Sequence, residues 1–195
     1  MKDAEMAAVP RMLPAIAAAT AAAGFSMASD IKVGALLRTL ATGKPGGVLL
    51  ELGTGTGLST VWLLDGMDRA TTLVTVDNDG SVQAIAQHHL GADARVRFHC
   101  GDGGAFLENM AGQGFDLIFA DTWPGKYDHL EDALGLLKPG GFYVVDDMLP
   151  QPNWPADHAP KVPPLIAALE SHPDLMLAKV SWSTGIILAT KKSDR

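Results

Sequence analysis

Five short apolar segments alternate with segments of helical character, and this alternation restricts the possible folds more than any other feature of the chain. The apolar segments span residues 46–52, 71–77, 94–100, 115–121 and 141–147. The helical segments between them span residues 57–66, 80–90, 103–112 and 127–137. Strands joined through helices run parallel with right-handed crossovers, and strands covered on both faces are continuously apolar, as these are. The sequence therefore predicts a doubly wound α/β fold.

Two further apolar segments, 175–182 and 185–190, are separated by too few residues for a crossover. They predict a C-terminal antiparallel hairpin, which completes a mostly parallel seven-stranded sheet. Residues 1–45 precede the first strand and predict an N-terminal helical cap, in which Ser29 or Asp30 is the N-cap of a helix. A chain of 195 residues fits a single domain, 1–195, with residues 46–195 as its α/β core.

Charge and cysteine content narrow the class of protein. The chain has 15 Lys and Arg against 22 Asp and Glu, a formal charge of −7, and its only basic pair is Lys191-Lys192. This balance disfavours nucleic acid and anionic membranes as partners. Cys100 is the only cysteine, which excludes an intrachain disulfide and agrees with a cytoplasmic location. No uninterrupted apolar run reaches the roughly 18 residues that a membrane span needs.

Acidic residues lie at the ends of the first five predicted strands, where doubly wound sheets bind their ligands. They are Glu51, Asp77, Asp102, Asp121 and the pair Asp146-Asp147. The first strand runs into "ELGTGTGLST", whose glycines allow a tight turn and close approach of a ligand. A dinucleotide motif would need glycine where Leu58 stands, and Glu51 would repel a pyrophosphate but attract a cation. S-adenosylmethionine is such a cationic ligand.

Two of these aspartates have specific expected roles in such a site. Asp77 is placed to accept hydrogen bonds from a ribose diol, and Asp102 is placed to bind an adenine amino group. The alternative is that each of them only caps a helix. Their joint occurrence at successive strand ends favours the cofactor interpretation.

Seven segments together resemble a known family. They are "SMASDIKVGALL", "LELGTGTGLST", "VTVDND", "GDGG", "DLIFADTWPGKY", "LLKPGGFYVVDDML" and "STGIILATKK". Across nearly its whole length the chain is similar to class I S-adenosylmethionine-dependent methyltransferases with a Rossmann-like fold. It most resembles the small metal-dependent O-methyltransferases, which include catechol and caffeoyl-CoA O-methyltransferases. Relatives of this size are often dimers, so the resemblance also implies a possible homodimer.

The resemblance implies two sets of site residues. The cofactor contacts would be Ser29, Glu51, Gly53, Thr54, Ser59, Asp77, Asp102 and Gly103. A divalent metal, Mg²⁺ or else Mn²⁺ or Ca²⁺, would bind Asp121, Asp146 and Asp147, and would explain two adjacent carboxylates after a buried strand. The metal would lower the pKa of a bound hydroxyl and hold it in line with the methyl group.

The chain departs from the family pattern at two positions. The last metal ligand is usually Asn, whereas Asp147 adds a negative charge here. The family's catalytic lysine follows the strand-four aspartate by three residues, where this chain has Pro124. Lys126 is the remaining candidate base beside Asp121 if the loop turns back, and otherwise it is an exposed loop lysine.

The expected reaction is methyl transfer to a small hydroxylated acceptor, such as a catechol or another vicinal diol. Trp123 and Trp154 are expected to form walls of the acceptor site, although Trp154 could equally be a packing anchor. Two other functions stay open. One is methylation of a hydroxylated tRNA base, and the other is cofactor binding with little catalysis.

Overall fold

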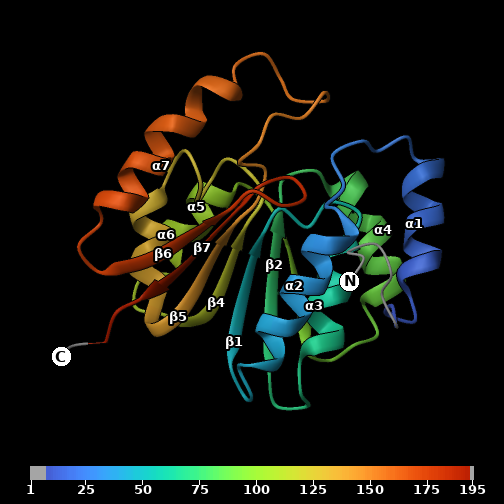
Figure 1. Ribbon diagram of the computed structural model, residues 1–195. Helices are drawn as coiled ribbons and strands as arrows, with labels where there is room; N and C mark the ends of the chain where they lie inside the picture. Colours follow the sequence, from blue (N-terminus) through green and yellow to red (C-terminus); the bar gives the residue numbers. More distant parts are fainter. Residues whose placement is uncertain (1–7, 194–195) are drawn as a thin grey trace.

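The computed structural model describes residues 8–193, so residues 1–7 of the predicted cap and residues 194–195 lie outside it. Seven strands form one sheet in the order β3-β2-β1-β4-β5-β7-β6 (Figure 1). The strands are β1 Val48–Leu52, β2 Thr72–Asp77, β3 Val96–Cys100, β4 Phe115–Ala120, β5 Leu137–Val145, β6 Leu175–Val180 and β7 Ile186–Lys191. Strands β1 to β5 pair in parallel, while β7 pairs antiparallel with β5 and β6. The predicted doubly wound fold with its C-terminal hairpin is confirmed.

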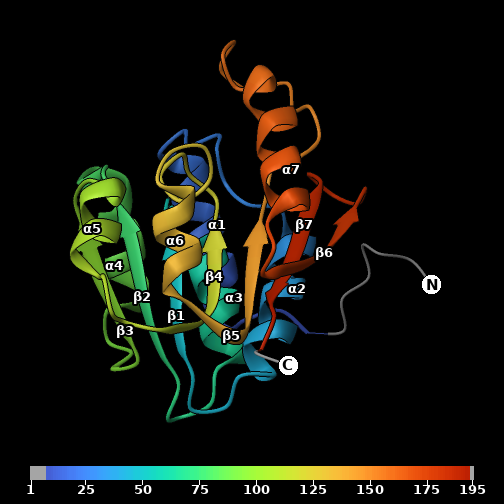
Figure 2. The same ribbon diagram turned by 90° about the vertical axis from the view of Figure 1, so that its left-hand side faces the viewer.

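Helices cover both faces of the sheet (Figures 1 and 2). They are α1 Leu13–Ala22, α2 Ile31–Thr42, α3 Leu58–Gly66, α4 Gly80–Leu90, α5 Gly103–Asn109, α6 Leu130–Leu136 and α7 Val162–Ser171, with a 3₁₀ turn η1 at Ala159–Lys161. Helices α1 to α4 share one buried cluster with the sheet, and α5 to α7 share the other. The helices of the predicted N-terminal cap therefore pack into the same layer as α3 and α4. Among residues 8–193, none of the helices is long and apolar enough to cross a bilayer.

Strand β1 illustrates why the core strands are continuously apolar. Leu49 packs toward the layer of α1 to α4, whereas Leu50 and Leu52 belong to the opposite cluster, and all three are fully buried. Burial of one such leucine side chain contributes roughly 1.5–3 kcal/mol. The parallel register aligns Leu52 with Val76 of β2 and with Ala120 of β4. The residues that follow these strands therefore meet at one edge of the sheet.

The boundaries around β5 differ from the sequence prediction. Helix α6 ends at Leu136, and β5 already begins at Leu137, so the "KPGG" segment lies within the strand, which starts before the predicted apolar segment 141–147. Extended backbone at Leu137 and the missing N–H of Pro139 both oppose continuation of the helix. The pairing with β4 shifts register between Phe115 and Leu117. Strand β5 ends at Val145, and the two aspartates follow it rather than forming its last residues.

Candidate active site

The turn after β1 depends on its glycines. Gly53, Gly55 and Gly57 all have positive φ, the left-handed region that residues with a side chain rarely adopt. A Cβ on Gly57 would lie 2.8 Å from the Cβ of Ala86 in α4, so a side chain does not fit there. The N–H groups of Gly53 and Thr54 donate to the carbonyl oxygen of Val76, at 2.9 and 3.1 Å. The turn is thus tied to β2 and leads directly into the N-terminus of α3.

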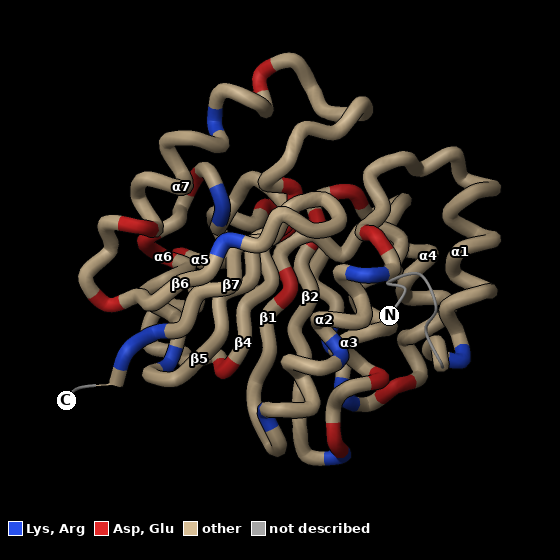
Figure 3. The backbone as a smooth tube through the Cα atoms, in the orientation of Figure 1, with Lys and Arg blue, Asp and Glu red and all other residues tan. Residues whose placement is uncertain are grey.

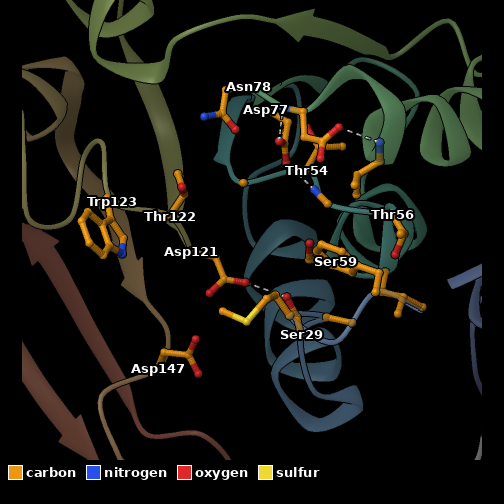
Figure 4. A pocket seen from close by; sticks show the side chains of 18 of the residues that line it. Ser29, Thr54, Thr56, Ser59, Asp77, Asn78, Asp121, Thr122, Trp123 and Asp147 are labelled. Carbon is orange, nitrogen blue, oxygen red and sulfur yellow. Dashed lines mark hydrogen bonds between the residues drawn. The ribbon is translucent and has the colours of Figure 1, made fainter. Parts of the chain in front are cut away.

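Asp77 supports this turn from the end of β2. Its Oδ2 accepts a hydrogen bond from the N–H of Gly55 at 2.7 Å, and its Oδ1 accepts one from the N–H of Asp79 at 2.9 Å. Asp79, not Asp77, is the N-cap of α4. Asp77 faces the cavity beside the turn (Figure 4). The alternative that Asp77 merely caps a helix is therefore wrong.

Asp102 is the N-cap of α5, because its Oδ1 accepts a hydrogen bond from the N–H of Ala105 at 2.8 Å. It also lines a small cavity of about 40 Å³ together with Gly103 and Asp77. Asp102 is therefore a helix cap, as the alternative predicted, and its contact with an adenine amino group stays a prediction. This small cavity shares Gly53, Asp77, Asn78 and Thr122 with the larger one.

The larger cavity, which we call the central pocket, has a volume of about 270 Å³. Most of the predicted site residues line this pocket, although they are far apart in the sequence (Figure 4). Its lining includes Ser29, Gly53, Thr54, Ser59, Asp77, Asp121, Trp123, Lys126 and Asp147. The structure therefore brings the glycine turn, the acidic strand ends and the loop after β4 into one site.

Glu51 does not line the central pocket. It is fully buried, and its Oε2 accepts hydrogen bonds from Thr60 of α3 at 2.6 Å and from Thr75 of β2 at 2.5 Å. Its Oε1 has no partner among residues 8–193. Burial raises the pKa of Glu51 to about 7, although the nearby hydroxyl groups oppose this rise. In this arrangement Glu51 connects the glycine turn to α3 and β2 and makes no open contact with a ligand.

Of the acidic residues after β4 and β5, Asp146 is buried, while Asp121 and Asp147 are half-buried. Asp121 accepts a hydrogen bond from the hydroxyl of Ser29 at 2.8 Å, and Asp146 accepts one from Thr184. Burial, reinforced by Asp146, raises the pKa of Asp121 well above its ordinary value. Burial also raises the pKa of Asp146 to about 6, against the hydrogen bond from Thr184. Two neighbouring carboxylates that have lost much of their hydration require a nearby positive charge, or bound protons.

The oxygen donors of these carboxylates suit a hard divalent cation, but their arrangement does not. Among residues 8–193, no group of three or more acidic, His or Cys side chains could hold a metal ion. Asp121 points toward Ser29, and the carboxylate of Asp147 lies apart from it (Figure 4). One oxygen of Asp146 is occupied by Thr184 and by the N–H of Asp147. As placed, the three carboxylates do not fit the predicted metal, so metal binding stays a prediction.

Lys126 is the positive charge that the fold brings to these carboxylates. The loop after β4 turns back on itself, because the N–H groups of Lys126 and Tyr127 donate to the carbonyl of Trp123 at 3.0 and 2.8 Å. The carbonyl of Gly125 also accepts a hydrogen bond from Tyr143. Lys126 is only 2 % exposed, so its interpretation as an exposed loop lysine is wrong. The loop turns back instead, as the other prediction required, and Lys126 lines the central pocket.

The surroundings of Lys126 change its acid–base properties. Burial lowers its pKa, while Asp121, Asp147 and Asp146 partly restore it. No carboxylate among residues 8–193 forms an ion pair with it within 4.0 Å, so the amino group can face a ligand in the central pocket. Pro124, at the position of the family's lysine, instead lies against Gly103 of α5.

The two predicted aromatic walls have different positions. Trp123 lines the central pocket, as expected. Trp154 does not line it and stacks on His158, with ring centroids 4.0 Å apart and an interplanar angle of 4°. His158 is the residue that reaches the pocket, and its Nε2 lies 2.8 Å from the hydroxyl of Tyr127. Trp154 is therefore a packing anchor behind the wall, since the segment after β5 folds with the imidazole inward.

Sequence reasoning missed several residues of the central pocket. Asn78 and Thr122 directly follow Asp77 and Asp121, so the same rule of strand ends could have found them. Phe25 lies beside Gly55, and no local pattern indicated this contact between segments thirty residues apart. His158 likewise gave no signal, because it lies in an irregular segment without periodicity.

Comparison with known proteins agrees with this geometry. Residues 50–148, about half of the chain, match the family model of a methyltransferase domain. A relative in Mycolicibacterium vanbaalenii, described as a putative O-methyltransferase, is 36% identical over 118 residues, which cover 58% of this chain and 52% of the relative. A relative in Mycobacterium avium with the same description is 36% identical over 119 residues, which cover 58% of this chain and 53% of the relative. The chain thus spans about half the length of the curated relatives it matches.

Solved structures share the fold over almost the whole chain. The O-methyltransferase TomG from Streptomyces achromogenes, solved in complex with SAM, has a TM-score of 0.83 and 24% identity, covering 95% of this chain and 92% of TomG. An O-methyltransferase from Bacillus cereus, solved with SAH, has a TM-score of 0.82 and 22% identity, covering 96% of this chain and 93% of the Bacillus protein. The glycine turn, the acidic strand ends and the matched residues lead to one conclusion: the chain belongs to the methyltransferase domain family.

Proposed function

We propose that this protein is an S-adenosylmethionine-dependent O-methyltransferase that acts on a small hydroxylated acceptor. The observation that carries the proposal is the meeting of the glycine turn, Asp77, Asp121 and Lys126 in one pocket. The names of the similar proteins support the same reaction class. Acidic segments gather at the carboxyl ends of the strands (Figure 3), which favours a small molecule over tRNA as the acceptor.

The cofactor would lie across the glycine turn. Asp77 would accept hydrogen bonds from the ribose, and the adenine would lie toward the small cavity beside Asp102 and Gly103. The sulfonium would then face Asp121 and Lys126, with Ser29 fixing the orientation of Asp121. The open end of the central pocket beside Trp123 would receive the acceptor.

Methyl transfer then needs a base for the acceptor hydroxyl. Lys126 in its neutral form would take the hydroxyl proton while the oxygen attacks the methyl carbon, so that the O–CH₃ bond forms as the C–S bond of the sulfonium breaks. The products are the methyl ether, S-adenosylhomocysteine and the protonated Lys126. Burial supports this role, because it lowers the pKa of Lys126. A catechol or other vicinal diol suits the site, since a second hydroxyl could bond Asp147.

The direct test is formation of S-adenosylhomocysteine from S-adenosylmethionine and a panel of catechols. Lys126→Met should lower kcat by roughly 10²–10⁴-fold, the usual contribution of a general base, without a change in cofactor affinity. Lys126→Arg should not restore activity, because a guanidinium cannot release its proton at neutral pH. Lys179→Met, at an exposed lysine that pairs with Glu170, is the matched control.

Two results would contradict the proposal. Full activity of Lys126→Met would show that Lys126 is not the general base. Tight cofactor binding by the wild type without turnover of any acceptor would favour a cofactor-binding protein. The divalent metal predicted from the sequence is tested in the same assay with EDTA. A loss of activity that only Mg²⁺ or Mn²⁺ reverses would mean that the carboxylates rearrange around a metal.

A further inference from the structure

A second cavity of about 510 Å³ lies between the loop after β4 and the start of α7. The segment between β5 and α7 and the first turn of α7 project beyond the carboxyl edge of the sheet (Figure 1). We call this cavity the α7 cavity. Its apolar wall includes Leu130, Pro160, Pro164 and Leu165. Lys126 lines both the α7 cavity and the central pocket, so the two sites meet at the proposed base.

The α7 cavity contains a half-buried cation without an acidic partner. Lys161 lines it, and no carboxylate among the described residues forms an ion pair with Lys161 within 4.0 Å. Its Nζ lies 4.5 Å from the ring centroid of Trp123, which lines the central pocket. Asp157 lines the same cavity and is exposed, so water weakens, but does not remove, its repulsion of a bound anion. Lys161 is therefore available to an anionic group that lies close to Trp123.

The start of α7 restricts which anion can bind there. A helix N-terminus usually offers free N–H groups to phosphate, but Pro163 and Pro164 of the first turn have none. A phosphate would therefore meet one ammonium and few other donors, and Asp157 would oppose its second charge. A carboxylate carries a single charge, which one lysine can match.

We propose that the acceptor is a hydroxylated aromatic acid whose carboxylate binds Lys161. Its ring would lie beside Trp123 and Tyr127, and its reacting hydroxyl would face Lys126 at the junction of the two cavities. This inference rests on the proposed O-methyltransferase function and adds the substrate class. Lys161 acts on specificity and takes no part in the chemical step.

The test compares matched acceptors that differ only in charge. We would measure kcat/KM for 3,4-dihydroxyphenylacetate and for its neutral amide. The acid should be preferred by roughly tenfold, because a charge-assisted hydrogen bond at a half-exposed site discriminates by about this factor. Lys161→Gln should abolish the preference by raising KM for the acid alone. Asp157→Asn should increase the preference, and Lys179→Gln should leave it unchanged.

Failure of this inference differs from failure of the proposed function. Equal use of acid and amide by the wild type, or an equal loss for both acceptors in Lys161→Gln, would refute a carboxylate site at Lys161. If no acceptor is methylated at all, the O-methyltransferase proposal fails first. In that case, calorimetry measures the affinities of the acid and the amide in the presence of S-adenosylhomocysteine, and their difference tests whether Lys161 binds the carboxylate. Equal affinities, or a difference that Lys161→Gln does not remove, would overturn the inference.

Discussion

Glu51→Gln should change how the stability of the folded chain depends on pH. Glu51 is fully buried, and burial raises its pKa to about 7 from an ordinary value of 4.5. Between these values the folded chain holds a proton that the unfolded chain has released. Burial of Glu51 therefore does not lower the free energy of unfolding at low pH, where the carboxyl is protonated in both states. The free energy of unfolding falls as pH rises from about 4.5 through about 7. The full loss is on the order of 3 kcal/mol.

The measurement is urea unfolding of the ligand-free protein at pH 5 and at pH 8. Gln cannot ionise, so the wild type should lose roughly 2–3 kcal/mol more than the variant between these two pH values. Other acidic groups titrate in both proteins and cancel in the difference. Glu131→Gln, at a side chain that is 79% exposed, should behave like the wild type and serves as the control. Parallel pH dependences of the wild type and Glu51→Gln would refute the reasoning, because they would mean that Glu51 is ionised at no cost.

Three further predictions concern packing, the cofactor and the metal. In urea titrations, Gly34→Ala should lower the free energy of unfolding by roughly 1–3 kcal/mol, because a Cβ at this position overlaps the buried indole of Trp62. Gly135→Ala is the contrasting variant: no atom lies near its Cβ, so it should raise the free energy of unfolding by about 0.5–1 kcal/mol. Asp77→Asn should weaken S-adenosylmethionine binding by about 1.5–3 kcal/mol in calorimetry, beyond any loss of stability of the ligand-free variant, and unchanged affinity would exclude the ribose contact. Addition of Mg²⁺ should leave the melting temperature of the ligand-free protein unchanged, since the carboxylates do not converge as placed; a rise with metal concentration would show a site that forms on binding.

The sequence by itself determined the fold class and the edge of the sheet that carries the site. Apolar segments separated by helices admit little besides a doubly wound sheet, and the parallel strands bring their ends together. That is why the sequence alone could assign Asp77, Asp121 and Asp147, which are widely spaced along the chain, to one edge of the sheet, where all three line the central pocket. The glycine turn was equally predictable, because its positive φ angles leave glycine almost no substitute.

Only the tertiary structure decided which side chains face the pocket. Glu51 and Asp77 both follow the rule of strand ends, yet Glu51 points between α3 and β2 toward Thr60 and Thr75. This direction depends on packing against α3, which no local pattern encodes. The position of Lys126 likewise depends on how the loop after β4 folds back onto distant strands. Irregular segments have no periodicity to predict their direction, so the sequence offered Lys126 and Trp123 only as candidates, and the structure showed that both line the central pocket.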